Sequence, residues 1–386
     1  MATHTPFRIG VDVTSALTQG GGIGRYTREL IRAVADQDRT NQYQLFSAKL
    51  VAEPPVANPL PTAPNFRYRA IQLNERWLYR FWYRARLPLP VQLATGKIDL
   101  FHSPDFVLPP VAGSIPTLLT VHDLSFVHFA DVYVPSLVRY LNQVVPWSVK
   151  RATHILADSE ATKRDLMSIY GVSAEKVTTL YAGVSPHFQS VTEAQQLRQM
   201  RQKYDLGNAP YILSVGTVQP RKNYQMLIRA FAPIAQQFPH NLAIAGGKGW
   251  LFDDILAEIE AQGLTGRVRF LGFVDDADLP TLYSDAALFA MPSIYEGFGI
   301  PILEAMACGV PVVVSNASCL PEVVGDAGIL LSPDDQQGWT DALATLLQDA
   351  ARCTQLVDMG ARQRQQFTWR KSAEQLINLY KQLLTQ

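Results

Sequence analysis

The chain has 386 residues, of which 47% are hydrophobic and 18% are charged, and its formal net charge is zero. This length predicts two domains with buried cores, and the balanced charge gives no sign of nucleic-acid binding. The three cysteines, Cys308, Cys319 and Cys353, form no CxxC pair and no cluster with histidine. Neither a structural zinc site nor a disulfide framework is therefore expected.

The first half of the chain alternates between short apolar runs and longer helix-like stretches. This alternation predicts an α/β domain in which helices cover both faces of a parallel sheet. The expected strands are 8–13, 43–48, 66–72, 99–102, 117–122, 154–158 and 177–181, and the expected helices are 24–35, 135–151 and 159–170.

The alternation restarts after a hinge-like stretch at 186–192. It predicts two doubly wound, Rossmann-like domains, 1–186 and 187–369, with a final helix in 370–386 that packs back on the first domain. The second set of expected strands is 211–215, 242–245, 268–271, 287–291 and 310–315, and the expected helices are 223–237, 252–262, 301–308 and 336–347.

A glycine-rich segment, 19–24, lies between the first strand and the first helix. Glycines let a phosphate or sugar approach the backbone closely, and the helix N-terminus supplies N–H groups. A tight turn or a dinucleotide fingerprint would have the same pattern. The fingerprint needs an acidic residue at the end of the second strand, but Asp36 and Asp38 precede that strand, which argues against a nicotinamide cofactor.

Two adjacent cations, Arg221 and Lys222, precede the helix expected at 223–237. A helix N-terminus disfavours positive charge, so this placement predicts a bound anion such as a diphosphate. The alternative is a pair of solvated surface cations.

Two glutamates, Glu296 and Glu304, stand eight residues apart in the segment 296–307. Glu296 belongs to a glycine-rich loop, and Glu304 falls about one turn into the next helix among apolar residues. Such a carboxylate is costly to bury without a partner. The alternative is one capping and one surface glutamate.

The spacing of these glutamates resembles the Glu-x7-Glu signature of retaining glycosyltransferases of family 4, which have the GT-B fold. The resemblance extends along the whole chain and includes the segments 19–24, 120–123, 216–223 and 321–324. It implies an acceptor-binding first domain and a donor-binding second domain that face each other across a cleft. One departure is 182–185, which reads Ala-Gly-Val-Ser where the family often has Asn-Gly-Val-Asp, so no substrate contact is assigned there.

The same resemblance implies roles for individual residues. Arg221 and Lys222 would bind the donor diphosphate, Glu304 the ribose hydroxyls, and Glu296 and His122 the transferred sugar. The base would lie at Phe273 and Val274, and further donor contacts would come from Gly22, Gly24, Gly216, Phe298, Gly299 and Ile300.

The resemblance further implies transfer of a hexose with retention by front-side displacement, without a cofactor or an essential metal. Segments 102–105 and 121–126 are similar to bacterial mannosyltransferases that use GDP-mannose, with a saccharide or a lipid-linked saccharide as the acceptor. UDP-glucose or another UDP-sugar remains an alternative donor. A nucleotide-sugar epimerase, a pyridoxal-dependent phosphorylase and an inactive sugar-binding module are alternatives of other classes.

Localisation is expected to be cytoplasmic, because the first apolar segment contains charges and no apolar run reaches the ~18 residues of a membrane span. The segment 76–86 is rich in arginine and aromatic residues, which as a helix would form separate basic and apolar stripes. Such a helix can lie on an anionic membrane, here the inner face of the plasma membrane. A core helix with solvated arginines is the alternative.

Overall fold

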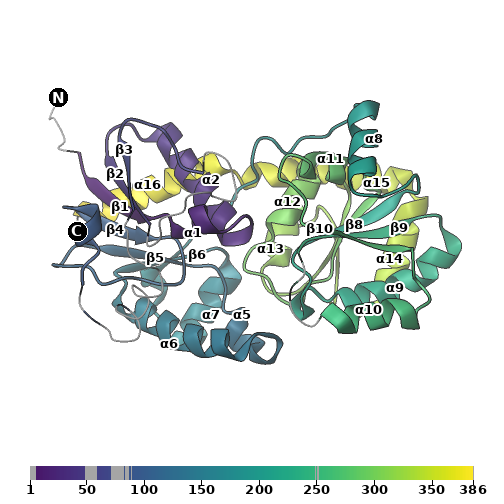
Figure 1. Cartoon of the computed structure of the whole chain (residues 1–386), viewed down its shortest axis with the longest axis horizontal. Helices are drawn as coiled ribbons and strands as arrows, with labels where there is room; N and C mark the ends of the chain where they lie inside the picture. Colours follow the sequence, from purple (N-terminus) through teal and green to yellow (C-terminus); the bar gives the residue numbers. More distant parts are fainter. Residues whose placement is uncertain are drawn as a thin grey trace. The chain divides into compact units, whose positions relative to one another are not determined.

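The computed structural model describes residues 6–47, 59–70, 82, 87, 89–247, 249 and 252–385. The chain divides into two compact units, each with its own parallel sheet (Figure 1). The first unit contains 1–128, 135–182 and 369–386, and the second contains 129–134 and 183–368. The chain thus passes between the units at Ala182–Gly183, four residues before the boundary expected from the sequence.

The sheet of the first unit has the strand order β3-β2-β1-β4-β5-β6-β7, and all of its paired strands are parallel. Its strands are β1 (Arg8–Asp12), β2 (Gln42–Ser47), β3 (Phe66–Ala70), β4 (Leu100–Ser103), β5 (Thr117–Val121), β6 (His154–Ala157) and β7 (Val177–Thr179). The helices described between them are α1 (Thr14–Thr18), α2 (Gly22–Gln37), α4 (Gln92–Thr95), α5 (Ser125–His128), α6 (Pro135–Arg151) and α7 (Glu160–Tyr170).

The sheet of the second unit has the order β10-β9-β8-β11-β12-β13, again with parallel pairing. Its strands are β8 (Tyr211–Val215), β9 (Asn241–Ala245), β10 (Val268–Gly272), β11 (Leu288–Met291), β12 (Val312–Ser315) and β13 (Ile329–Leu331). Its helices are α8 (Ala194–Lys203), α9 (Tyr224–Gln237), α10 (Phe252–Ala261), α11 (Leu279–Ser284), α12 (Ile300–Ala307), α13 (Leu320–Val324), α14 (Gln336–Gln348) and α15 (Ala350–Gln363).

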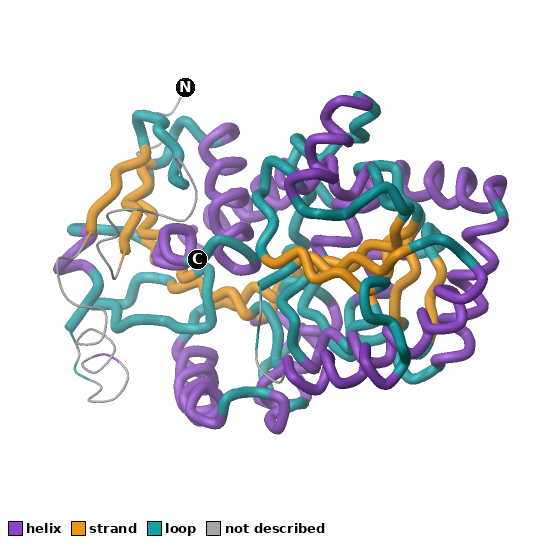
Figure 2. Tube along the Cα trace, turned by 45° about the vertical axis from the view of Figure 1, so that its right-hand side comes forward, coloured by secondary structure: helices purple, strands orange, loops and turns teal. Residues whose placement is uncertain are grey.

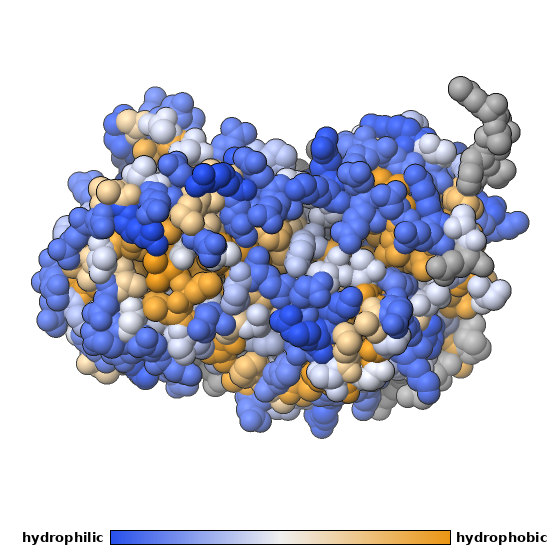
Figure 3. All heavy atoms as spheres, turned by 180° about the vertical axis from the view of Figure 1, so that it is seen from behind, coloured by the Kyte–Doolittle hydropathy of each residue, from blue (hydrophilic) through white to orange (hydrophobic). Residues whose placement is uncertain are grey.

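The inner strands of both sheets, such as β6 and β11, are mainly apolar and buried, as parallel sheets with helices on both faces require. The edge strand β3 instead exposes Arg67, Tyr68 and Arg69. Figure 2 shows the strands of each unit as an inner layer with helices around them. In the second unit, Phe231 of α9 and Trp339 of α14 are fully buried in one core with Ile212 and Leu242 of the sheet. On the face shown in Figure 3, hydrophilic residues predominate and hydrophobic side chains show between them.

The last helix, α16 (Trp369–Thr385), belongs to the first unit and packs against α2. Its apolar stripe includes Leu376 and Tyr380, both buried. The Gln37 amide also donates to the carbonyl of Arg370 at 2.9 Å, and the Ser372 hydroxyl donates to the carbonyl of Tyr181 at 2.7 Å. The chain therefore returns to its first sheet after completing the second.

Candidate functional site

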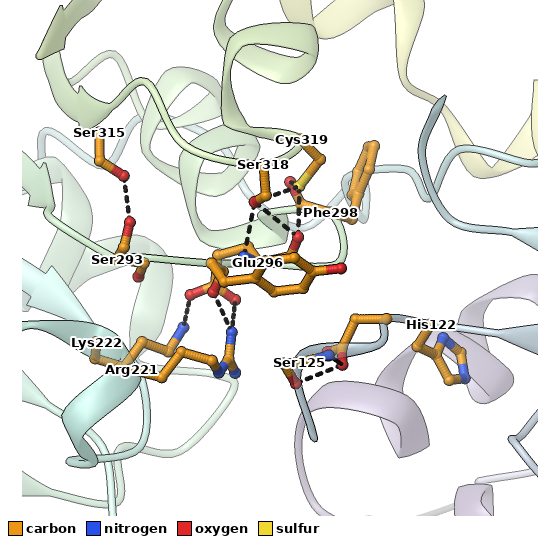
Figure 4. Close-up of polar contacts among 12 residues, drawn as sticks. His122, Ser125, Arg221, Lys222, Ser293, Glu296, Phe298, Ser315, Ser318 and Cys319 are labelled. Atoms are coloured by element: carbon orange, nitrogen blue, oxygen red, sulfur yellow. Dashed lines mark hydrogen bonds and ion pairs between the residues drawn. The ribbon is translucent and has the colours of Figure 1, made fainter. Parts of the chain in front are cut away.

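The second unit holds a buried group of three charged side chains at the end of β8. Arg221 and Lys222 lie on a 3₁₀ turn, Pro220–Lys222, that connects this strand to α9. Arg221 Nη1 donates to Glu296 Oε2 at 2.8 Å, and Lys222 Nζ donates to Glu296 Oε1 at 2.6 Å (Figure 4). The two cations and the glutamate of separate sequence motifs thus form one cluster, which we call the charge triad.

The charge triad carries a net charge of +1, because one carboxylate neutralises only one of its two cations. Burial alone would raise the pKa of Glu296, but attraction to Arg221 and Lys222 outweighs it and lowers the pKa to about 2. All three side chains are about nine-tenths buried, so the two cations are not solvated surface residues. A buried excess of positive charge is suited to binding an anion.

A serine and a cysteine hold the backbone of the Glu296 loop. The Ser318 hydroxyl accepts from Glu296 N at 2.8 Å and donates to the Glu296 carbonyl at 3.0 Å. The Cys319 thiol lies 3.1 Å from the same carbonyl and 3.0 Å from that of Phe298 (Figure 4). Sequence reasoning missed both residues, because nothing in a short motif shows that a loop 22 positions away is their partner.

The second glutamate of the motif, Glu304, lies inside α12 and is only 1% exposed. Its Oε2 accepts a hydrogen bond from the Tyr283 hydroxyl of α11 at 2.8 Å. Gly299 caps this helix with a φ of 111°, a left-handed conformation that favours glycine. Phe298 is buried just before the cap, and Ile300 begins the helix.

Gly216 lies where β8 ends, directly beside the charge triad. A Cβ atom added there would come within 2.9 Å of Lys222 Cε, so glycine leaves the space that the lysine occupies. Phe273 and Val274 follow β10 in the same unit. Val274 is buried, whereas the Phe273 ring is 65% exposed, which is unusual for a large apolar side chain and leaves it available to a flat ligand.

In the first unit, the glycine-rich segment forms the turn from α1 into α2. A Cβ at Gly24 would lie 2.2 Å from the Gln19 carbonyl oxygen, whereas one at Gly22 would meet nothing within 4 Å, although Gly22 has a φ of 49°. The buried guanidinium of Arg28 donates to the carbonyls of Ala16, Gln19 and Gly20 at 2.6 to 3.0 Å. Sequence reasoning missed Arg28, which lies a full turn into the helix and looks like a surface residue.

His122 directly follows β5 in the first unit and is 6% exposed. Its Nδ1 lies 2.7 Å from Oδ2 of Asp158, which follows β6, and its Nε2 lies 3.2 Å from the Pro104 carbonyl oxygen. The rings of Tyr26 and Phe106 contact the imidazole edge to face. The candidate residues therefore form two groups, one in each unit, and His122, Gly22 and Gly24 belong to the first.

Within the described ranges, no group of three His, Cys, Asp or Glu side chains is arranged to hold a metal ion. Among the helices in those ranges, none is both long and apolar enough to cross a membrane. The expected amphipathic helix 76–86 lies outside the described residues, apart from Trp82.

Comparison with known proteins assigns the chain to a family. Residues 197–366 match the model for glycosyl transferases group 1, and residues 20–188 match the model for glycosyltransferase family 4. O-antigen chain mannosyltransferase B of Escherichia coli is 34% identical over 372 residues, which cover 94% of this chain and 96% of that protein. The serotype-specific mannosyltransferase WbdA of Escherichia coli is 30% identical over 294 residues, 73% of this chain but 36% of that longer protein.

Among solved structures, sucrose-phosphate synthase from Thermosynechococcus elongatus superposes with a TM-score of 0.77 at 22% identity, covering 98% of this chain and 99% of that one. At this identity the likeness shows the fold alone. The chain belongs to glycosyltransferase family 4 and has the GT-B fold, with one Rossmann-like sheet in each unit. It is therefore an enzyme of the glycosyltransferase class.

Proposed function

We propose that the protein is a hexosyltransferase that moves mannose from GDP-mannose to a saccharide or lipid-linked saccharide acceptor with retention at the anomeric carbon. The observation that carries the proposal is the charge triad, whose net positive charge is buried and suited to a donor diphosphate. The choice of mannose is supported by the names of the two relatives, both of which are mannosyltransferases.

The donor would lie on the second unit. In this proposal, Arg221 and Lys222 bind the diphosphate, Glu304 accepts from the ribose hydroxyls, and the exposed Phe273 ring with Val274 contacts the base. Backbone groups of Gly216 and of 298–300 complete the donor contacts. In the first unit, His122 binds the transferred sugar, and Gly22 and Gly24 lie beside the phosphates.

In the proposed reaction the anomeric C–O bond breaks, and its electron pair passes to the leaving phosphate oxygen. The acceptor hydroxyl attacks the anomeric carbon from the same face, and its proton goes to that phosphate oxygen. Arg221 and Lys222 stabilise the negative charge that grows on the leaving diphosphate, which lowers the barrier because the charge is larger in the transition state. Both oxygens of Glu296 already accept from cations, which makes this carboxylate a weak nucleophile.

The test is nucleotide release from purified protein incubated separately with GDP-mannose, UDP-glucose, UDP-galactose, UDP-N-acetylglucosamine and ADP-glucose, with a chelator in place of divalent metal. We expect GDP from GDP-mannose alone, and a loss of about 100-fold or more in the Arg221→Ala/Lys222→Ala variant. Arg229→Ala is the matched control, because the Arg229 side chain is 45% exposed and pairs with Glu258 instead of with the charge triad.

Each other outcome of this test has a definite meaning. Release of UDP would preserve the transferase class and overturn the choice of donor. Isomerised donor with no transfer would indicate an epimerase. Activity that is lost with the chelator and restored by Mg²⁺ would contradict the metal-independent mechanism. Contact of 76–86 with anionic membranes stays a prediction, because that segment lies outside the described residues.

A further inference from the structure

The two ring nitrogens of His122 both face groups that accept hydrogen bonds. One is the Asp158 carboxylate, 2.7 Å from Nδ1, and the other is the peptide carbonyl of Pro104, 3.2 Å from Nε2. A peptide carbonyl has no proton to give, so Nε2 must carry the proton of that hydrogen bond. The remaining proton lies between Nδ1 and Asp158, whichever of the two atoms holds it. The His122–Asp158 pair therefore holds two protons, whether the second one is on Nδ1 or on the carboxylate.

The charged groups around the His122 ring also favour two protons on the His122–Asp158 pair. Asp105 and Asp123 add negative charge near the pair, and burial raises the pKa of both Asp105 and Asp158. Burial alone would lower the pKa of His122, but attraction to Asp158, hydrogen bonding to it and attraction to Asp105 outweigh burial and raise the pKa to about 9.

The other titratable neighbours do not compete for this proton. His102 bonds Tyr380 and Thr120 through its two nitrogens, and burial lowers its pKa to about 3, so it is neutral. The Tyr26 ring contacts the imidazole at its edge, and burial keeps the tyrosine hydroxyl protonated by raising its pKa well above the ordinary value. Asp12, beyond Asp105, has a pKa raised by burial to about 6.

We propose that Asp158 is a positioning residue that keeps a proton on Nε2 of His122 and a second proton between Nδ1 and its own carboxylate, so that His122 acts in the reaction as a hydrogen-bond donor and not as a base. A sugar oxygen that reaches this edge of the ring would share the Nε2 proton with the Pro104 carbonyl. The acceptor hydroxyl would then lose its proton to the leaving phosphate. This consequence for the reaction rests on the proposed function, whereas the protonation state does not.

The decisive experiment is NMR of the full-length protein labelled with ¹⁵N-histidine, recorded between pH 5.5 and 8.5. Signals of His122 are assigned by their absence in His122→Gln. In the wild type we expect these signals to stay unchanged from pH 5.5 to about 7.5 and to shift only above it, towards the pKa of about 9. In Asp158→Asn we expect the pKa of His122 to fall by about one to three pH units, because the opposite charge beside it is gone. Asp158→Glu, which keeps the charge, should restore the wild-type behaviour.

Asp165→Asn is the matched control, because Asp165 pairs with the partly exposed His128 at 3.1 Å in the same unit. It should leave the signals of His122 unchanged. Titration of wild-type His122 with an ordinary midpoint near 6.5 would overturn the proposal, and so would an unchanged pKa in Asp158→Asn. These results do not depend on turnover, so they stand even if no donor is hydrolysed or transferred.

The role in the reaction has its own readout in the pH profile of kcat. If His122 acts as a hydrogen-bond donor, the kcat of the wild type should not change with pH across the range in which His122 stays protonated. A kcat that rises with pH as the His122 signals lose a proton would show that the residue is a base. Absence of both nucleotide release and nucleotide-sugar binding with every donor would contradict the proposed function and leave the NMR result intact.

Discussion

Glu296 is the residue on which the net charge of the charge triad depends, because it is the partner of two buried cations. Its pKa is lowered from an ordinary value of 4.5 to about 2. A carboxylate with a lowered pKa stabilises the fold above its unfolded-state pKa, and this stabilisation is lost as the pH falls through the folded-state value. The relevant range is therefore pH 4.5 down to pH 2.

We predict that Glu296→Gln lowers the free energy of unfolding at pH 7 by about 3 kcal/mol, because two buried cations lose their counter-charge. The difference between variant and wild type should shrink as the pH falls from 4.5 towards 2, which urea unfolding midpoints would measure. Glu258→Gln is the control, since Glu258 pairs with a single arginine that is 45% exposed, and its loss should be smaller than that of Glu296→Gln. A difference that stays constant with pH would show that Glu296 is not ionised in the folded protein.

Cys319 provides a second prediction for a single side chain. Replacing it by alanine removes the thiol from the carbonyls of Glu296 and Phe298, while Ser318 still donates to that of Glu296, so we expect the cost of one lost hydrogen bond, about 0.5–1.5 kcal/mol. We expect Cys319→Ala to weaken binding of GDP-mannose in calorimetric titration, and Cys319→Ser to retain most of it. Cys353→Ala removes a comparable thiol contact, to Leu346, and should not change donor affinity.

At the scale of elements, the turn between α1 and α2 is packed so tightly that it leaves no space for a side chain at Gly24. A side chain at Gly24 would collide with the Gln19 and Ser15 carbonyls, whereas one at Gly21 would meet nothing within 4 Å. We predict that Gly24→Ala destabilises the protein by about 1–3 kcal/mol and that Gly21→Ala is nearly neutral. Thermal unfolding of the two variants measures the difference; equal losses would mean that the turn can relax.

The predicted elements were most accurate where the sequence has a strong local pattern. Apolar runs located the strands, and glycine loops located the starts of α2 and α12. The helix expected at 223–237 begins at Tyr224, because Pro220–Lys222 form a 3₁₀ turn and Asn223 takes a left-handed conformation. Strand β13 and several helices were not predicted, since they are short or largely polar and their stability comes from packing on the rest of the unit. These helices are α1, α4, α5, α8, α11, α13 and α15.

At the scale of the whole molecule, the return of α16 ties the C-terminus to the first unit. We predict that Tyr380→Ala, which leaves a cavity and removes the hydrogen bond to His102, lowers stability by about 3–5 kcal/mol. Hydrogen exchange should accelerate in β1 to β7 more than in β8 to β13. Trp339→Ala, in the core of the second unit, should have the opposite distribution. Equal acceleration in both units from either variant would contradict this division.

The sequence by itself determined the fold class, through two rounds of strand and helix. The glycine loops and the spaced pair of glutamates identified the class of the protein by their resemblance to a family. These are local features, because strand and helix periodicity and backbone freedom depend on neighbouring residues. Only the tertiary structure decided which groups meet. Glu296 joins cations 74 and 75 positions away, and Asp158 reaches His122 across 36. Such contacts depend on the order of the strands, which brings distant strand ends to one edge of the sheet. They also depend on burial, because a buried charge is costly without a partner.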